Sequence, residues 1–231
     1  MSIVLNQIVP WGRSLEEYIL MFDLSKKELE GNILGCSDGA ASFNSEMTSL
    51  GYRVISVDPI YVFSREQIRK QIENTYETII NQVKQNQHNY LWDYYGDPDT
   101  LGQKRLSIME KFLADYNVGC SENRYQTQSL PSLSFSDKQF DLALCSNFLF
   151  LYSNKLSLDF HLTSLKELCR VATEVRLFPL LSLDCKISPY VKPVFNYFSN
   201  SKEFYVEVKK VPYEFQRGGN EMMWIRQIQN Q

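Results

Sequence analysis

The stretch between Asn32 and Asp58 constrains what this chain can fold into more than any other part of the sequence. An apolar run leads into a small-residue loop at positions 35–39, and a helical stretch follows. A β-type run at positions 53–57 then ends on Asp58. Strand, glycine loop, helix, strand and carboxylate form a βαβ unit, which builds a nucleotide-shaped site from backbone amides and one acid. The sequence therefore predicts a site for a nucleotide-like ligand.

Helical patterns surround this unit. Ser14 and Ser25 each stand three residues before a glutamate, the capping-box pattern that opens a helix, so we expect two short helices before the first strand. After Asp58, apolar residues at spacings of three and four predict a helix over positions 65–83 and another around positions 106–116. A crossover between parallel strands needs only one helix, so two helices indicate an insertion, which can act as a lid.

The second half of the chain continues the alternation of strands and helices. We expect, in order, a weak strand at 124–128, a buried strand at 140–145, a helix at 157–170, a strand at 174–181, a helix at 190–198 and a hairpin of 204–215 and 222–227 with its turn at 216–219. The predicted fold class is α/β: a doubly wound, mostly parallel sheet with helices on both faces, a helical insertion after the second strand and a C-terminal antiparallel hairpin.

The length of 231 residues, with 44% hydrophobic and 22% charged residues, fits one globular domain. We expect a single domain over residues 1–231, with residues 1–31 as a helical cover and residues 65–118 as the insertion. Right-handed crossovers bring the loops after parallel strands to one edge of the sheet, where ligands bind. The segments expected to converge there are 35–39, 58–61, 129–133 and 146–150, joined by 179–183 and the hairpin turn.

Composition disfavours several classes of partner. The net charge of −3, the pI near 5.5 and the lack of a basic patch disfavour nucleic acid. Five cysteines, an odd number without a CxxC pair or a secretory leader, predict reduced thiols in a cytoplasmic protein. No apolar run approaches the roughly 20 residues of a membrane span. The two histidines, His88 and His161, lie far apart, so no metal site is predicted. The oligomeric state is open.

A dinucleotide is one candidate ligand. The GxGxxG fingerprint of NAD-binding folds falls here on Gly35, Ser37 and Ala40. Its second glycine normally lets the pyrophosphate approach the backbone, and Ser37 makes that approach harder. An NAD-dependent oxidoreductase is therefore an alternative, but a disfavoured one.

The same residues carry a closer resemblance. The chain resembles the class I S-adenosylmethionine (SAM)-dependent methyltransferases, whose Rossmann-like domain has a GxGxG-type loop, matched by positions 35–39, and an acid closing the next strand, matched by Asp58. A later pattern of an LPF-like loop and an apolar strand beginning Phe-Asp is matched by positions 133–135 and 140–144. The resemblance spans residues 30 to about 181. It implies SAM as cofactor and transfer of its methyl group to an acceptor.

The resemblance also implies which residues contact the cofactor. The glycine loop, with Gly35, Cys36, Ser37 and Gly39, would pass under the methionine and ribose portion, and Asp58 would accept hydrogen bonds from the ribose hydroxyls. Further along the chain, the implied contacts are Ser129 or Leu130 beside the adenine, Cys145, Ser146 and Asn147 beneath the sulfonium, and Arg13 as a clamp on the methionine carboxylate.

Two departures from the family pattern keep a third alternative open. The family usually has an acid two residues before the first glycine, where this chain has Ile33, and Ser37 replaces the second glycine. The acid helps to hold the methionine amino group, so another residue must do so here. A non-catalytic module that binds a nucleotide or SAM is the alternative that Ile33 favours.

The acceptor is harder to predict. The (N/D)PP(Y/F) motif of amino-directed nucleic-acid methyltransferases is absent after the fourth strand, which favours a small molecule. No residue stands out as catalytic: His161 is a candidate base or a packed helix-face histidine, and Arg217 in the hairpin turn is a candidate acceptor contact. Trp92, Tyr94 and Tyr95 could line an acceptor pocket or pack within the insertion.

Overall fold

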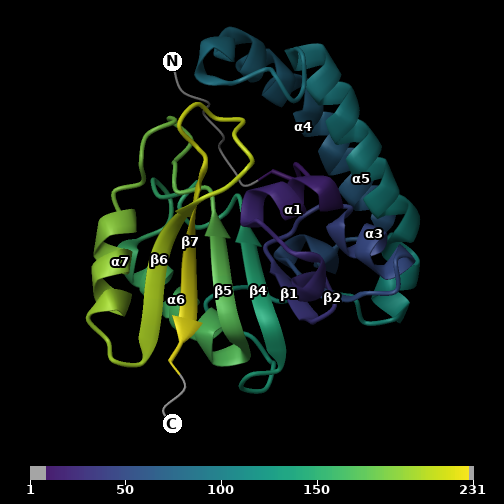
Figure 1. Ribbon diagram of the computed structural model, residues 1–231. Helices are drawn as coiled ribbons and strands as arrows, with labels where there is room; N and C mark the ends of the chain where they lie inside the picture. The colour runs from purple at the N-terminus through teal and green to yellow at the C-terminus, as the bar shows by residue number, and fades with distance from the viewer. Residues whose placement is uncertain (1–8, 229–231) are drawn as a thin grey trace.

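The computed structural model describes residues 9–228, so residues 1–8 of the expected N-terminal cover lie outside the described part. A single seven-stranded sheet has the strand order β3-β2-β1-β4-β5-β7-β6 (Figure 1). The strands are β1 (Asn32–Cys36), β2 (Arg53–Val57), β3 (Tyr125–Gln126), β4 (Phe140–Ser146), β5 (Ala172–Phe178), β6 (Phe204–Lys210) and β7 (Glu221–Gln227). The five strands from β3 to β5 pair in parallel, and β7 pairs antiparallel with both β5 and β6. The predicted fold class is confirmed.

The helices cover both faces of the sheet. They are α1 (Leu15–Phe22), α2 (Lys26–Leu29), α3 (Phe43–Ser49), α4 (Arg65–Gln85), α5 (Pro98–Ser121), α6 (Leu158–Val171) and α7 (Val191–Ser199), with short 3-10 turns η1 (Pro59–Val62) and η2 (Gln87–Asn89). The predicted capping boxes at Ser14 and Ser25 are both formed, and Ser64 caps α4 in the same way. The helix starts could therefore be predicted from side chains that accept hydrogen bonds from the free N–H groups of the first turn.

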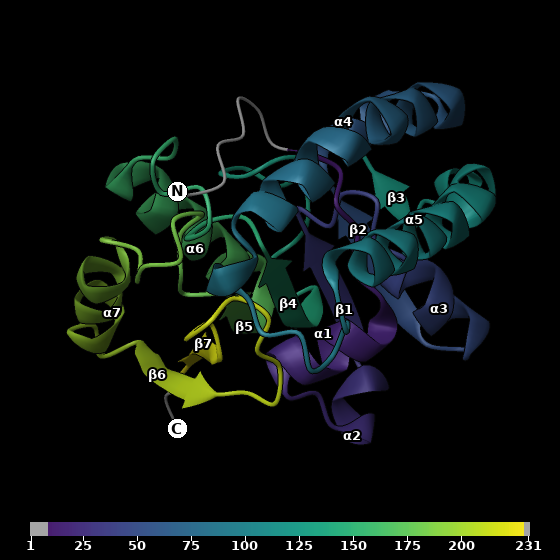
Figure 2. The ribbon, with the colours of Figure 1, turned by 90° about the horizontal axis from the view of Figure 1, so that it is seen from above.

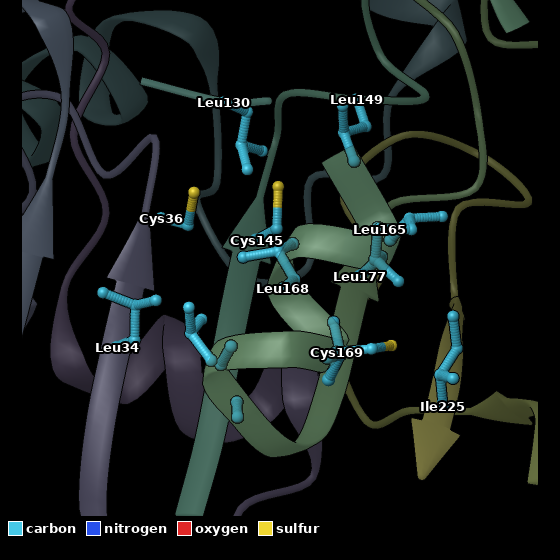
Figure 3. Packing of buried hydrophobic residues seen from close by; sticks show 14 of the residues in the cluster. Leu34, Cys36, Leu130, Cys145, Leu149, Leu165, Leu168, Cys169, Leu177 and Ile225 are labelled. Atoms are coloured by element: carbon cyan, nitrogen blue, oxygen red, sulfur yellow. The ribbon is translucent and has the colours of Figure 1, made fainter. Parts of the chain in front are cut away.

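Successive side chains of each strand point to opposite faces of the sheet, so the core forms two layers. Leu34 and Cys36 pack with α6 and α7 on one face, whereas Ile33 packs with α1 and α3 on the other. Figure 3 shows Cys36 and Cys145 projecting from neighbouring strands toward the layer that contains Leu130. A central parallel strand buried on both faces needs apolar residues at successive positions, which explains the continuous apolar run of β4.

The insertion forms a long helical pair beside and above the sheet. In Figure 1 α4 and α5 rise past the α3 side of the molecule, and in Figure 2, seen from above, α4 crosses over the carboxyl ends of the central strands. Arg69 on α4 makes a bidentate ion pair with Glu110 on α5. The insertion therefore stands where the ligand-binding edge of such a sheet is expected.

The C-terminal hairpin differs from the prediction. The first strand ends at Lys210 rather than at Phe215, and positions 211–220 leave the sheet as a long loop. Val211 N–H still donates to the Asn220 carbonyl, but Pro212 follows it, and proline has no N–H to donate to the strand ladder. The loop instead reaches the insertion, where Leu91 N–H donates to the Phe215 carbonyl over 2.8 Å and Arg217 N–H donates to the Asn89 carbonyl over 2.9 Å.

A buried ion pair fastens the insertion to the N-terminal helix. Arg105 on α5 is fully buried and donates from Nη1 and Nη2 to the two Glu17 carboxylate oxygens over 2.6 and 2.7 Å. Burial raises the pKa of Glu17, but the Arg105 guanidinium outweighs burial and holds the pKa at about 2. Tyr95 adds its hydroxyl to the same network. Both charges are therefore paired in a region without water to solvate them.

Replacing Arg105 by methionine should destabilise the protein strongly, because the Glu17 carboxylate would stay buried without its cation. Loss of one partner of a buried pair costs about 3–5 kcal/mol, against about 1 kcal/mol or less for an exposed pair. We expect this difference between Arg105→Met and the control Lys84→Met, which breaks the exposed pair of Lys84 with Asp99. Urea unfolding followed by circular dichroism measures it, and equal losses in the two variants would contradict the account.

Candidate functional site

One large cavity of about 490 Å³ opens at the carboxyl ends of the parallel strands. All six segments expected to converge contribute to its wall: the loops after β1, β2, β3, β4 and β5, and the loop before β7. The insertion contributes as well, through residues of α4, Tyr90 and Leu101. The cavity volume lies within the roughly 300–1,000 Å³ typical of small-molecule sites.

The glycine loop after β1 has a shape that its sequence requires. Ser37 and Gly39 have φ angles of 58° and 56°, and Ser37 N–H donates to the Val57 carbonyl over 2.8 Å. A Cβ atom on Gly35 would lie 1.8 Å from Asp38 Oδ2, so a side chain there would collide with that carboxylate. The loop therefore folds back tightly on the end of β1 and faces the cavity with residues 37–39.

Asp58 is fixed by the backbone at the end of β2. Its Oδ2 accepts a hydrogen bond from Gly39 N–H over 2.9 Å, and its Oδ1 accepts one from Ile60 N–H over 2.8 Å. Burial raises its pKa to about 6 even though both bonds favour the charged form. The carboxylate lines the cavity, and each oxygen keeps a lone pair for a ligand hydroxyl.

A second carboxylate, Asp38, lies deeper in the same wall and is 6% exposed. It accepts hydrogen bonds from the Tyr18 hydroxyl on Oδ1 and from the Ser56 hydroxyl on Oδ2, each 2.6 Å long. Ser146 Oγ donates in turn to the Tyr18 hydroxyl over 3.1 Å. Burial raises the pKa of Asp38 to about 7, and the nearby Asp58 adds to the shift. This chain of hydroxyls ties the ends of β1, β2 and β4 to α1.

Arg13 brings a positive charge to the same wall. Its Nη1 donates to the Trp11 carbonyl over 2.6 Å, and its Nη2 donates to Asn147 Oδ1 over 3.4 Å. Its Nε lies 3.6 Å from Glu17 Oε1, and no hydrogen-bond partner for this nitrogen is found among residues 9–228. The guanidinium therefore stands beside Asn147, which follows β4, with hydrogen-bonding capacity to spare.

Most residues expected to contact a cofactor meet at this cavity. Its wall includes Arg13, Ser37, Gly39, Asp58, Ser129, Leu130, Ser146 and Asn147. Gly35, Cys36 and Cys145 do not reach it, because they lie within β1 and β4, where both thiols are buried in the apolar layer. Those three residues shape the strands that carry the loops rather than the cavity wall.

The two catalytic candidates lie away from the cavity wall. His161 is fully buried on α6, where its two ring nitrogens lie 2.7 and 2.9 Å from the carbonyl oxygens of Ser157 and Leu149. Burial lowers its pKa, so it is a packed helix residue and not a base facing the site. Arg217 is exposed, and its guanidinium lies 3.4 and 3.5 Å from the carbonyl oxygens of His88 and Tyr90, so its role as an acceptor contact stays a prediction.

Sequence reasoning missed Asp38 and Tyr90 as cavity residues. Asp38 lies in the loop at positions 35–39, which drew attention through its glycines. The signal that could have identified it is an acid at a position where such loops usually have a small residue. Trp92, Tyr94 and Tyr95 do not line the cavity. Their rings pack mainly on Phe215 and Tyr213 of the C-terminal loop and not only within the insertion, whereas Tyr90 faces the cavity. Within the described residues, no cluster of three potential metal ligands occurs, and no helix is long and apolar enough to cross a membrane.

Comparison with known proteins places the chain in a family. No protein-family model matches it. The uncharacterized protein MJ0045 of Methanocaldococcus jannaschii is 30% identical over 223 residues, which make up 96% of this chain and 97% of the archaeal protein. The chain belongs to the family of that protein.

Solved structures with a similar backbone include three proteins. Magnesium protoporphyrin IX methyltransferase (ChlM) of Synechocystis PCC 6803, with bound SAM, is 10% identical with a TM-score of 0.49, over 93% of this chain and 78% of that one. The PH0226 protein of Pyrococcus horikoshii OT3 is 14% identical with a TM-score of 0.49, over 93% and 88%. A putative SAM-dependent methyltransferase of Methanococcus maripaludis is 12% identical with a TM-score of 0.45, over 94% and 84%.

The raised pKa of Asp38 predicts a pH-dependent stability. The folded protein holds this proton up to about pH 7, whereas the unfolded chain releases it near the usual aspartate pKa of 3.8, a difference of about 4 kcal/mol. The contribution of Asp38 to the free energy of unfolding is therefore fully present below about pH 4 and is lost as the pH rises to about 7. We expect Asp38→Asn, compared with wild type by urea unfolding, to gain relative stability across that range. The exposed Asp93→Asn is the control, and a parallel pH dependence of Asp38→Asn and wild type would contradict this account.

Proposed function

We propose that the protein is a SAM-dependent methyltransferase. The observation that carries the proposal is the Asp58 carboxylate, which the amides of Gly39 and Ile60 hold in the cavity wall beside the glycine loop. A carboxylate so fixed at the end of the second strand is suited to the two hydroxyls of a ribose. The resemblance of the loop and of Asp58 to the methyltransferase motifs supports SAM as the ligand.

The remaining wall residues fit the parts of this cofactor. Ser129 and Leu130 would lie beside the adenine, and Ser146 and Asn147 beneath the sulfonium. Arg13 would bind the methionine carboxylate, because a guanidinium can form two parallel hydrogen bonds with a carboxylate. Asp38 would stand in for the acid that Ile33 replaces: it lies in the cavity wall, whereas Ile33 is buried in the apolar layer. A ligand ammonium near Asp38 would favour its charged form.

Methyl transfer requires little of the protein beyond alignment of the cofactor with the acceptor. The sulfonium is an activated leaving group, so the enzyme must hold the acceptor atom in line with the methyl carbon and sulfur, and such positioning supplies roughly 7–11 kcal/mol. The absence of a histidine from the described cavity wall is compatible with this chemistry. A cavity of small-molecule size lined in part by the insertion favours a small-molecule acceptor, and five free cysteines favour a cytoplasmic site of action. Closure of the insertion, residues 65–118, over the ligand stays a prediction.

Replacing Asp58 by alanine should weaken binding of S-adenosylhomocysteine, the demethylated cofactor. Two hydrogen bonds to a charged acceptor are lost, each worth about 1.5–3 kcal/mol, so the dissociation constant should rise at least about 100-fold. Isothermal titration calorimetry measures the change, with the exposed Asp93→Ala as the charge-matched control. Undiminished binding by Asp58→Ala, or binding of NADH in place of S-adenosylhomocysteine by the wild type, would sink the proposal.

The role of Arg13 can be separated from that of Asp58 by shortening the ligand. 5′-Methylthioadenosine keeps the adenine, ribose and sulfur but lacks the amino-acid end. We expect Arg13→Met to bind S-adenosylhomocysteine about tenfold or more weakly than wild type, for loss of a charge-assisted hydrogen bond, while binding 5′-methylthioadenosine equally well. Asp58→Ala should weaken both ligands. An equal loss for both ligands in Arg13→Met would show that Arg13 acts on the fold of the site and not on the carboxylate.

A further inference from the structure

The cavity continues beyond the groups assigned to the cofactor. Its far part lies between the insertion and the C-terminal loops and is called the acceptor half here. The residues that define it are Ile79, Val83 and Leu101 of the insertion and Leu183, Tyr213 and Phe215 of the C-terminal loops. Asn147 N–H donates to the Phe178 carbonyl over 2.6 Å, and the Phe178 ring packs on Tyr213 with centroids 5.7 Å apart. The acceptor half therefore lies next to the residue assigned to the sulfonium, where a methyl acceptor would lie if the proposed function holds.

The acceptor half carries no charge of its own. Among the described residues of the whole cavity wall, the charged side chains are those of Arg13, Asp38 and Asp58, and all three belong to the cofactor side. A charged acceptor would lose its water in this half without gaining a counter-ion, which is costly in an apolar surrounding. The lining therefore selects against both anions and cations.

Tyr90 brings a polar group to this space, where the Tyr213 hydroxyl is already bonded to Glu17 and the Gln216 amide lines the same cavity. Tyr90 is 3% exposed and lines the cavity, and no hydrogen bond to its hydroxyl is found within residues 9–228. Burial raises its pKa, so the hydroxyl remains a neutral donor and acceptor. Because Tyr90 lines the cavity, its hydroxyl can bond there to water or to a ligand. The Tyr90 hydroxyl is thus available to one polar atom of a bound molecule.

The ring of Tyr90 is held in place from the other side. It stacks on Phe215 with centroids 4.6 Å apart, and the backbone bonds at Leu91 and Asn89 fix this segment to the loop before β7. In Figure 2 the end of α4 and that loop meet above the sheet. Aromatic walls of this kind favour a flat ring, which they contact over a large area at little entropic cost.

We propose that the acceptor is an uncharged, largely apolar ring compound, bound between the insertion and the C-terminal loops, with one polar atom hydrogen-bonded to the Tyr90 hydroxyl. The proposal rests on the proposed function and names its substrate class. It follows from the geometry of the lining and from the one unpartnered hydroxyl.

Three probes that share a naphthalene ring and differ in charge test the preference for a neutral acceptor. Protein saturated with S-adenosylhomocysteine is titrated at neutral pH with 2-naphthol, with 2-naphthoate and with 2-naphthylmethylammonium, and binding is followed by calorimetry. We expect the neutral probe to bind at least about tenfold more tightly than either ion, since each ion must be desolvated without a partner. Binding of either ion as tight as that of 2-naphthol overturns the proposal.

Three variants locate the site. Tyr90→Phe keeps the ring and should weaken 2-naphthol about fivefold, the loss of one neutral hydrogen bond, while leaving naphthalene unchanged. Leu183→Trp should fill the acceptor half and abolish probe binding, whereas Ile187→Trp, on the same small loop but 67% exposed, should not.

Probe binding that survives Leu183→Trp overturns the proposal. Binding of S-adenosylhomocysteine without any probe also overturns it and leaves the proposed function standing, whereas failure of S-adenosylhomocysteine itself overturns both.

Discussion

The buried carboxylate of Asp38 is the constraint on which the rest of the site depends. It takes its two hydrogen bonds from hydroxyls on α1 and β2, and through Tyr18 it reaches Ser146 at the end of β4. The same carboxylate fills the space where a side chain at position 35 would stand, which makes Gly35 obligatory. The glycine loop, the first helix and three strand ends are therefore positioned by one group, and the cavity wall follows from that arrangement.

The charges around the cavity fall into two kinds. Glu17 and Arg105 neutralise each other and hold the insertion to α1, so they have no charge left for a ligand. Asp38 and Asp58 form no ion pair within residues 9–228, and burial raises the pKa of both. Two carboxylates against the single guanidinium of Arg13 in one wall favour a ligand that carries positive charge, which the sulfonium and ammonium groups of SAM, the proposed cofactor, would supply. The apolar acceptor half has no such preference.

The fold could be predicted from the sequence because the signals that indicate its helices and strands are local. Capping serines, the helical stripe of α4, the continuous apolar run of β4 and the βαβ pattern each reflect a rule that operates within a few residues. What failed depended on distant partners. Positions 211–215 have a strand-like composition, yet they leave the sheet because Pro212 interrupts the ladder and the Tyr90 segment offers them other hydrogen bonds. His161 was open to a catalytic reading until the carbonyls of Ser157 and Leu149 were placed around it.

A crystal structure of the protein with S-adenosylhomocysteine tests the central claim most directly. We expect the adenosine in the cavity at the carboxyl ends of β1, β2 and β4, with both ribose hydroxyls within about 3 Å of the Asp58 carboxylate oxygens. The thioether should point toward the space enclosed by the insertion and the C-terminal loops. Ligand density elsewhere on the molecule, or ribose hydroxyls turned away from Asp58, would contradict the account.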